Sequence, residues 1–489
     1  MRVAWLGLCL VVACSGGDDG KSDTASLGGT TSGDTDTDAD ADTDADADSD
    51  TDADTDTDTD TDTAAIQDVQ VEQHPLIPSI LSVTWEQATP CEAHLAFALE
   101  DGEERASPSR AYDGAARELV LGVPFDHEVT VHVVDDCGNE SAPVVARTGA
   151  PPPDLPVSDV LTDVPALQDP SMAFHMASFG GGGLPSYGWT TIIDRQGRVV
   201  WAWRTAPFRI TMQPQLSFDR DRLLIDENAF WGSFNAADSQ VVEIDIEGTE
   251  HHRFDTPGLH HPFAALPDGR IAYGAGSLGP FGALSGNETL AVVDRSGVNE
   301  VLWDCYETLR AELGFETTCG SNTLRWHEDR GVFLFSFYSL ETVFEIDGVT
   351  GEATRWFGQL PGSYAFDPED SAFWWQHSAH YTADGTLMVS TKNRDRGDET
   401  WVREYSLDDK TETLTEVWRF GEGEGLYGAT EGEALVLAGG NVLHNYGSLP
   451  VVREVTREGE VVWEVHFPAS PEIHRSSPLS LDDLYGLRD

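Results

Sequence analysis

Apolar and polar residues alternate in several short runs between residues 66 and 150. An apolar residue at every second position is typical of a strand with one buried face. The alternating sets are Leu81, Val83 and Trp85; Ala93, Leu95 and Phe97; Leu119 and Leu121; and Val129, Val131 and Val133. The pattern predicts a small β-sandwich over residues 66–150, and the three prolines at 151–153 predict a stiff boundary after it.

Residues 160–489 carry a different pattern, an internal repeat with a period of about 50 residues. Each unit has an apolar residue followed by Asp, in most units a Gly a few residues later, and in most units a Trp further on. The Asp positions, with Thr in the last unit, are Asp194, Asp245, Asp294, Asp347, Asp408 and Thr456. We interpret the Asp-to-Gly segments as hairpin turns and the Trp residues as packing between blades.

Six repeats of a unit with several strands are typical of a β-propeller. We therefore expect an all-β protein with a six-bladed β-propeller over residues 160–489. The sandwich that precedes the propeller resembles an immunoglobulin-like or fibronectin III-like module.

The N-terminus has the pattern of an export signal. The apolar run from Val3 to Val12 is too short to span a bilayer as a helix. Val11 to Cys14 resembles a bacterial lipobox, which predicts removal of residues 1–13 and acylation of Cys14; a plain signal peptide is the alternative. Ser15, where an Asp would favour the inner membrane, indicates the outer membrane. We expect an exported protein, anchored by lipid to the bacterial cell envelope with its body on the periplasmic or surface side.

Residues 14–65 form an acidic, low-complexity linker. Asp stands at every even position from 34 to 62. Such a sequence cannot bury a core, so we expect it to be disordered. The formal net charge of the chain is −57. Nucleic acids and anionic lipids bind basic faces, so nucleic acid is not an expected partner and the lipid anchor is the expected contact with the membrane.

Six cysteines are present, of which Cys9 leaves with the signal and Cys14 carries the lipid. The remaining four are Cys91, Cys137, Cys305 and Cys319. An even number in an oxidising compartment predicts two disulfides. Their positions favour the pairs Cys91–Cys137 and Cys305–Cys319, and four free thiols are the alternative.

Two histidine clusters occupy equivalent positions in their repeats. His260 and His261 lie shortly before the turn at Gly269, and His377, followed by His380, lies shortly before the turn at Gly385. Recurrence at one repeat position predicts that both clusters face the central axis from the same side of the ring. We expect a functional site there; hydrogen-bonded structural histidines are the alternative.

Three stretches of the repeat region resemble the bacterial arylsulfotransferases that use no nucleotide sulfate donor. They are His260 to Gly269; Gln376-His377 with Asp384 to Leu387; and Gly440 to Leu443 with Arg453 to Val455 and Gly459 to Glu464. The resemblance covers residues 66–489. It implies that small molecules are the partners, and that a histidine carries a sulfuryl group from an aryl sulfate to a phenol in two steps, without a cofactor or a metal ion.

In this resemblance His377 is the nucleophile, and His260 or His261 binds the sulfate or serves as the acid and base for the phenol oxygen. The family places His-x-Asn-Ser in an intervening blade and an Arg on the following strand. Here residues 320–323 read Gly-Ser-Asn-Thr, and Tyr338 stands in place of the Arg. Asn322 and Tyr338 are therefore candidate substrate contacts.

Developing negative charge on the sulfuryl group needs cations or hydrogen-bond donors. The nearby groups that can replace the Arg are Lys392 and Arg394, our candidate substrate-binding cations, and Arg325 and His327. A lysine has no planar fork, so the replacement is not equivalent. Aromatic residues near the site, either core or contacts for flat rings, are Phe373, Trp374, Trp375 and Tyr381.

Three other readings stay open. A non-catalytic propeller that serves as a binding or assembly module at the cell surface accounts for the missing His and Arg. A quinoprotein-like propeller is suggested by the single run from Asp347 to Gly351 followed by Trp356. Metal binding by His260, His261 and His377 is the third, although no carboxylate adjoins these histidines in sequence.

Overall fold

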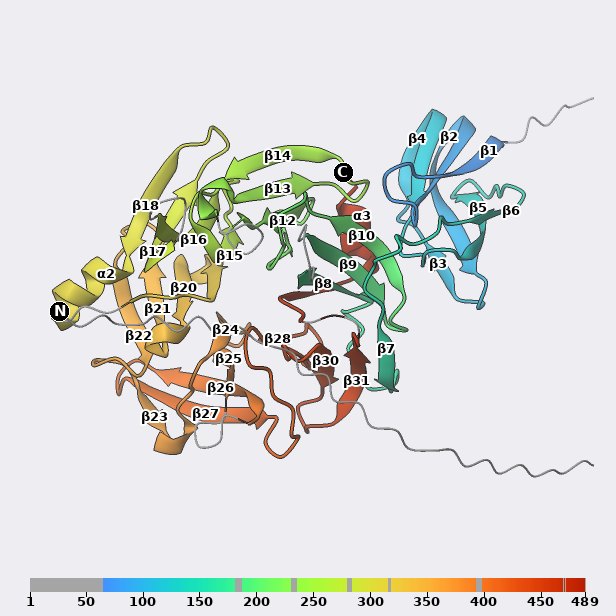
Figure 1. Cartoon of the computed structure of the whole chain (residues 1–489). Helices are drawn as coiled ribbons and strands as arrows, with labels where there is room; N and C mark the ends of the chain where they lie inside the picture. The colour runs from blue at the N-terminus through green and yellow to red at the C-terminus, as the bar shows by residue number, and fades with distance from the viewer. Residues whose placement is uncertain are drawn as a thin grey trace, which may run out of the picture. The chain divides into compact units, whose positions relative to one another are not determined.

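The computed structural model (Figure 1) describes residues 65–180, 187–229, 235–278, 284–314, 318–392, 398–468, 470 and 472–488. The predicted signal segment, Cys14, almost all of the linker, and Arg394 lie outside these residues. The described elements are mainly strands, with two short α-helices, α2 (Cys305–Thr308) and α3 (Leu481–Gly486), and a few short 3₁₀ or π helices. The all-β fold class is confirmed. No helix in the described part is long and apolar enough to cross a membrane.

The N-terminal strands form one connected sheet. Its members are β1 (Ile66–Gln73), β2 (Leu81–Leu99), β3 (Glu104–Ala106), β4 (Arg110–Val120), β5 (Glu128–Asp135) and β6 (Val144–Arg147). The sequence predicts separate strands around residues 81–85 and 93–97, but β2 runs through both. Its first half pairs with β1 and β4, its second half with β3 and β5, and the register with β4 shifts between Gln87 and Cys91. Most of the alternating apolar residues form its core, whereas Leu119 and Leu121 pack in a separate cluster with Trp201.

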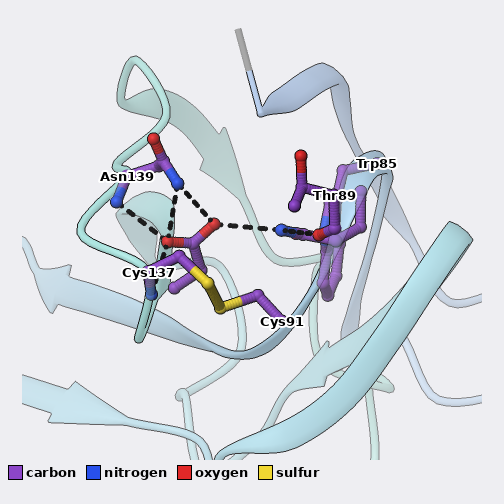
Figure 2. The surroundings of a disulfide bond; sticks show 7 residues. Trp85, Thr89, Cys91, Cys137 and Asn139 are labelled. Carbon is purple, nitrogen blue, oxygen red and sulfur yellow. Dashed lines mark hydrogen bonds between the residues drawn. A yellow bond between two sulfur atoms is a disulfide. The ribbon is translucent and has the colours of Figure 1, made fainter.

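Both disulfides favoured by the sequence are present. Cys91–Cys137 joins the middle of β2 to the turn after β5, and Cys305–Cys319 closes a 14-residue separation that begins at α2. Figure 2 shows the first of them beside Asn139, whose backbone and side-chain N–H groups donate to the buried carboxylate of Asp135.

Six further sheets follow along the chain. The first sheet contains β8 (Phe174–Gly180), β9 (Gly188–Asp194), β10 (Val199–Arg204) and β32 (Ser476–Leu479). The second sheet contains β11 (Gln215–Leu216), β12 (Leu223–Glu227), β13 (Gln240–Ile244) and β14 (Glu250–Asp255). The third sheet contains β15 (Leu259–Ala265), β16 (Ile271–Leu278), β17 (Leu284–Val293) and β18 (Asn299–Asp304). The fourth contains β19 (Thr323–His327), β20 (Val332–Phe337), β21 (Thr342–Asp347) and β22 (Ala353–Gly358); the fifth β23 (Ala365–Asp367), β24 (His377–Tyr381), β25 (Leu387–Lys392), β26 (Thr400–Asp408) and β27 (Thr413–Phe420); the sixth β7 (Asp159–Asp163), β28 (Glu433–Val436), β29 (Val442–Asn445), β30 (Val451–Val455) and β31 (Val461–His466).

The strands at the two ends of this region pair with strands that are far away in sequence. The C-terminal strand β32 pairs with β8 and completes the first sheet, while β7 pairs with β31 and extends the last. Edge strands of consecutive sheets lie side by side, β15 with β19, β19 with β24, and β24 with β28. The inner strands therefore bring residues far apart in sequence to one place.

The repeated Asp and Trp have the roles that the pattern predicts. Asp194 Oδ1 accepts from the backbone N–H groups of two residues in the turn between β9 and β10. Trp201 Nε1 donates at 2.8 Å to Ile246, in the corresponding turn of the next sheet. Trp463 of the last sheet donates at 2.8 Å to Arg195 of the first. Trp201 and Trp463 thus fasten neighbouring sheets to each other, whereas Trp356 Nε1 donates to Pro361, just after its own strand.

Candidate functional site

A cavity of about 300 Å³ collects the predicted site residues. It is lined by Ile210, Met212, His260, His261, Asn322, Tyr338, Trp375, His377, Lys392, Ala429, Thr430, Glu431, Glu472 and His474. Six of the predicted residues are among them, namely His260, His261, Asn322, Tyr338, His377 and Lys392. They come from three sheets, which explains why no single stretch of sequence contains the site.

The strands that carry the histidines are irregular at those residues. In β15, Leu259 pairs with Ala275 but Phe263 pairs with Tyr273, so β15 has extra residues where the two histidines lie. In β24 the register with β25 shifts between His377 and His380. Bulges of this kind redirect side chains away from the regular alternation of a strand.

The backbone beside His377 is also unusual. Trp375 has a φ of 52° and Ser378 a φ of 55°, in the left-handed region that non-glycine residues rarely occupy. Such conformations cost about 1–3 kcal/mol each and persist where the surroundings hold them. The N–H of Ser378 donates to Thr323 Oγ1 at 2.8 Å, and this hydrogen bond helps to hold Ser378 in its left-handed conformation. The rest of the fold thus fixes the direction of His377.

The protonation state of His377 follows from its contacts. The carbonyl oxygen of Trp375 lies 3.0 Å from Nδ1 of His377 and can only accept, so Nδ1 carries the hydrogen and Nε2 keeps its lone pair. Burial lowers the pKa of His377 to about 3, and the nearby charges of Arg475 and Lys392 add to the effect. His377 is therefore a neutral imidazole with an unprotonated Nε2 throughout the neutral pH range.

His260 has a different partner. Glu288 Oε1 lies 3.0 Å from its Nδ1, and the same buried carboxylate accepts from the N–H of Ser321 at 2.9 Å and from its hydroxyl group. A carboxylate on one ring nitrogen orients an imidazole. Glu288 thus fixes the direction in which the His260 ring points.

His261 lies against His260, with 4.1 Å between the ring centroids. Its Nδ1 is 3.7 Å from Glu431 Oε1. Burial lowers the pKa of His261 well below its ordinary value, and His260 and Arg475 lower it further. The second histidine of the pair is therefore neutral and able to donate a hydrogen bond.

Asn322 and Tyr338 both reach the cavity. Asn322 Nδ2 donates at 2.6 Å to the carbonyl oxygen of Gln376, the residue that precedes His377. Tyr338 lies beside Gly320, and burial, with the charges of Glu288 and Glu431, raises the pKa of its hydroxyl group. Tyr338 therefore stays protonated and can donate to an anionic oxygen.

Lys392 is a cation in the lining. Its Nζ donates to the carbonyl oxygen of Ala429 and lies 5.2 Å from the ring centroid of Trp375 and 5.4 Å from that of Tyr427. Burial lowers the pKa of Lys392 to about 8. The ammonium group is charged at neutral pH but loses its proton more readily than an exposed lysine.

Arg325 and His327, the other proposed substitutes, do not line the cavity. Arg325 forms an ion pair with the buried carboxylate of Glu433, and His327 Nε2 accepts from the N–H of Tyr381 at 3.3 Å. Their sequence proximity to Asn322 misled the prediction, because alternate residues of β19 face different ways.

Sequence reasoning missed four residues around the cavity, namely Glu431, Glu472, His474 and Arg475. The buried guanidinium group of Arg475 donates to the carbonyl oxygen of Asn322, to Thr323 Oγ1 at 2.9 Å and to the carbonyl oxygen of Gly432 at 3.3 Å. Residues 472–475 precede β32 and carry no repeat signature. Only the prediction that a C-terminal strand returns to the first sheet could have indicated them.

Residues 184–474 match the family model described as "Arylsulfotransferase (ASST)". The match spans more than half of the chain, and the protein belongs to the arylsulfotransferase family. No curated protein matches the chain.

Several solved structures show a loose likeness. One is a protein of unknown function from Bacteroides caccae, 16% identical, covering 63% of this chain and 99% of that chain with a TM-score of 0.42. A virginiamycin B lyase from Staphylococcus aureus is 10% identical; the match covers 67% of this chain and 89% of the lyase, with a TM-score of 0.37. A putative 6-phosphogluconolactonase from Bacteroides uniformis is 12% identical; the match covers 80% of this chain and 98% of that protein, with a TM-score of 0.38. Likeness at this level carries no argument about the site.

Proposed function

We propose that the protein is a lipid-anchored aryl-sulfate sulfotransferase in which His377 carries the sulfuryl group. The six consecutive sheets are its six-bladed propeller, over residues 160–489, and residues 66–150 are an immunoglobulin-like or fibronectin III-like module. The observation that carries the proposal is the hydrogen bond from His377 Nδ1 to Trp375, because it leaves the lone pair of Nε2 for attack. Membership of the arylsulfotransferase family supports the reaction class.

In the first step Nε2 of His377 attacks the sulfur of an aryl sulfate. The N–S bond forms, the bond from sulfur to the aryl oxygen breaks, and the phenolate leaves with a proton from His260. In the second step an acceptor phenol gives its proton back to His260, and its oxygen attacks the sulfur while the N–S bond breaks. The pair of His260 with Glu288 supports this role.

Three groups stabilise the charge that develops on the sulfuryl oxygens. They are the ammonium group of Lys392, the hydroxyl group of Tyr338 and the amide of Asn322, all in the cavity lining. Hydrogen-bond donors fixed in a site of low dielectric stabilise such charge without reorganisation. Trp375 and Tyr427, the exposed aromatic residues beside Lys392, have ring faces on which the aryl ring of a substrate can stack.

The test is release of a coloured phenol from its sulfate ester by the full chain, with and without an acceptor phenol. We expect release that depends on the acceptor and is lost in His377→Ala. The matched control is His466→Ala, because His466 pairs with Glu464 at the end of β31 and does not line the cavity. A folded protein that releases no phenol from a panel of aryl sulfates contradicts the proposal.

A non-catalytic binding module is the second candidate. It is favoured by one observation, that no arginine is among the described residues that line the cavity. The quinoprotein-like reading has no comparable support. In the described part, the group whose possible ligand atoms lie close together is Cys91, Asp135 and Cys137, whose cysteines form a disulfide; His260, His261 and His377 are not such a group.

For location we propose export and acylation at Cys14, with the acidic linker between the lipid and the folded part. The two disulfides support an oxidising compartment. Metabolic labelling with a fatty acid should mark the wild-type chain but not Cys14→Ser. Equal labelling of both contradicts the lipobox interpretation.

A further inference from the structure

The side chain of Gln376, the residue before His377, is held by a neighbouring sheet. Gln376 is 0% exposed and directly precedes β24 of the fifth sheet. Its Nε2 donates to Ser336 Oγ at 3.1 Å, to the carbonyl oxygen of Phe337 at 3.2 Å and to that of Thr342 at 3.2 Å. These three acceptors belong to β20 and β21 of the fourth sheet. The side chain of Gln376 therefore ties the start of β24 to the fourth sheet.

The chemistry of these acceptors requires an amide at position 376. Two of them are backbone carbonyl oxygens, which can only accept, so the group that faces them must carry N–H. A glutamate would turn carboxylate oxygens toward the two carbonyls, and a methionine of similar length would offer no donor. Among the residues that the structure describes, Gln376 Oε1 has no hydrogen-bond partner. Every hydrogen bond of this side chain therefore leads to the fourth sheet.

The backbone on both sides of Gln376 is also held. Its own carbonyl oxygen accepts from Asn322 Nδ2 at 2.6 Å, and the carbonyl oxygen of Trp375 is the acceptor 3.0 Å from His377 Nδ1. Trp375 has a φ of 52°, a conformation that persists in a non-glycine residue only where the surroundings hold it. Because Trp375 and Gln376 share a peptide group, a rotation of Gln376 turns the Trp375 carbonyl away from the imidazole of His377.

Gln376 acts on the site from outside the cavity. Trp375 and His377 line the cavity, whereas Gln376 and Ser378 are both 0% exposed. Successive residues of a strand point to opposite sides, so the two buried residues flank the imidazole in sequence and face the protein interior. Gln376 thus has no contact with a substrate and affects the reaction only through the peptide group that it shares with Trp375.

We infer that Gln376 is a positioning residue, whose amide fixes the Trp375 carbonyl as the acceptor for His377 Nδ1 and so keeps Nε2 free to attack. The consequence for catalysis rests on the proposed function. The positioning itself does not, because it concerns only the tautomer and the direction of an imidazole.

Nitrogen NMR of the full chain, produced with isotope-labelled histidine, tests the positioning without turnover. The ring nitrogen that carries the hydrogen is set by the hydrogen bond that the ring makes. We expect the His377 signal, identified by its loss in His377→Ala, to show a hydrogen on Nδ1 and none on Nε2. In Gln376→Met a signal averaged between the two tautomers should replace it. An unchanged signal in Gln376→Met overturns the inference.

Single-turnover kinetics measures the consequence for catalysis. In Gln376→Met the rate of the first step should fall about 10²-fold with little change in binding of the aryl sulfate, because a misdirected nucleophile affects the transition state and not the bound ground state. Ser336→Ala removes one of the three acceptors and should lower the rate by a smaller factor; it keeps the test in force if Gln376→Met does not fold. A loss of aryl-sulfate binding as large as the loss of rate indicates a collapsed cavity and overturns the inference.

Gln87→Met is the matched control. Gln87 is a buried glutamine of β2, 1% exposed, whose Nε2 donates to the carbonyl oxygen of Thr89 at 3.1 Å and to Asp135 Oδ2 at 2.9 Å. It does not line the cavity. Its replacement should lower the stability but leave the His377 signal and the rate unchanged. Equal effects of Gln87→Met and Gln376→Met on the signal or the rate contradict the inference.

The outcomes also separate this inference from the proposed reaction. A His377 tautomer that depends on Gln376, in a protein that transfers no sulfuryl group, leaves the positioning in place and overturns the proposed function. Sulfuryl transfer that continues at the full rate in Gln376→Met leaves the reaction in place and overturns the positioning.

Discussion

The hydroxyl group of Tyr338 lies 3.1 Å from the position that a Cβ atom on Gly320 would take. The two residues that depart from the family pattern are therefore in contact, one with no side chain and the other with a ring in the space beside it. A larger residue at position 320 requires Tyr338 to move.

Coupling between these positions can be measured. Gly320→His should lower the free energy of unfolding by about 1–3 kcal/mol, because overpacking at a filled position forces neighbours to move. Tyr338→Ala should remove most of that penalty. Urea unfolding of the wild type, both single variants and the double variant gives the coupling energy. Simple additivity of the two effects contradicts the contact.

Lys392 should set an alkaline limit to activity. Burial lowers its pKa to about 8, so the charged form is lost as the pH rises through that value, and stabilisation of the sulfuryl oxygens is lost with it. The rate of aryl-sulfate turnover should fall above pH 8. Lys392→Met should lower the rate at neutral pH by about 10²-fold.

Lys392→Arg separates charge from structure. Arginine stays protonated, so the alkaline fall should move to higher pH even if the maximal rate is reduced. An unchanged profile in this variant would assign the fall to another group.

Thr323 should position His377 without touching the substrate. Its Oγ1 accepts from the N–H of Ser378 and from Arg475 Nη2. Thr323→Val leaves the buried N–H of Ser378 without an acceptor and removes one of the two acceptors of Arg475 Nη2, which should cost about 1–3 kcal/mol of stability. We expect kcat to fall with little change in KM, and Thr323→Ser to restore it. Equal losses in both variants would indicate a packing effect rather than a hydrogen bond.

Stability should fall in mild acid. Burial lowers the pKa of several histidines, namely His74, His175, His261, His327, His377, His380, His444 and His474. For His175, His444 and His474 the pKa falls to about 3, against an ordinary value of about 6.5, so between these values the unfolded chain binds protons that the folded chain does not.

Each such histidine removes up to about 1.4 kcal/mol of stability per pH unit as the pH falls below 6.5. Asp226 and Glu431, whose pKa values burial raises to about 6 and about 7, act in the opposite direction but are fewer. Urea unfolding at pH 7 and pH 5 should show the loss. The same stability at both values contradicts the buried neutral state of these histidines.

Much of this architecture follows from short-range patterns in the sequence. Alternating residues such as Val129 and Val131 form a buried face, and the turn at Asp194 and the packing of Trp201 depend on a few neighbouring residues. Short-range periodicity therefore predicts strands, turns and the repeat. It did not predict that β2 runs unbroken through Pro90, because the pairing of its two halves with different strands is a long-range property.

The site was only partly predictable for the same reason. His260 and His377 could be found because they occupy matching repeat positions. Glu431, Glu472 and Arg475 come from irregular segments whose place depends on closure by β32. Arg325 was misplaced because nearness in sequence to Asn322 does not mean a shared face of the strand.

The central claim is that Nε2 of His377 accepts the sulfuryl group. The most direct measurement is mass spectrometry of the full chain after mixing with an aryl sulfate and no acceptor phenol, followed by fragmentation to locate the modified residue. We predict one sulfuryl group on His377, its disappearance when a phenol is added, and none in His377→Ala. Phenol release without modification of His377, or a sulfuryl group on another residue, would contradict the account.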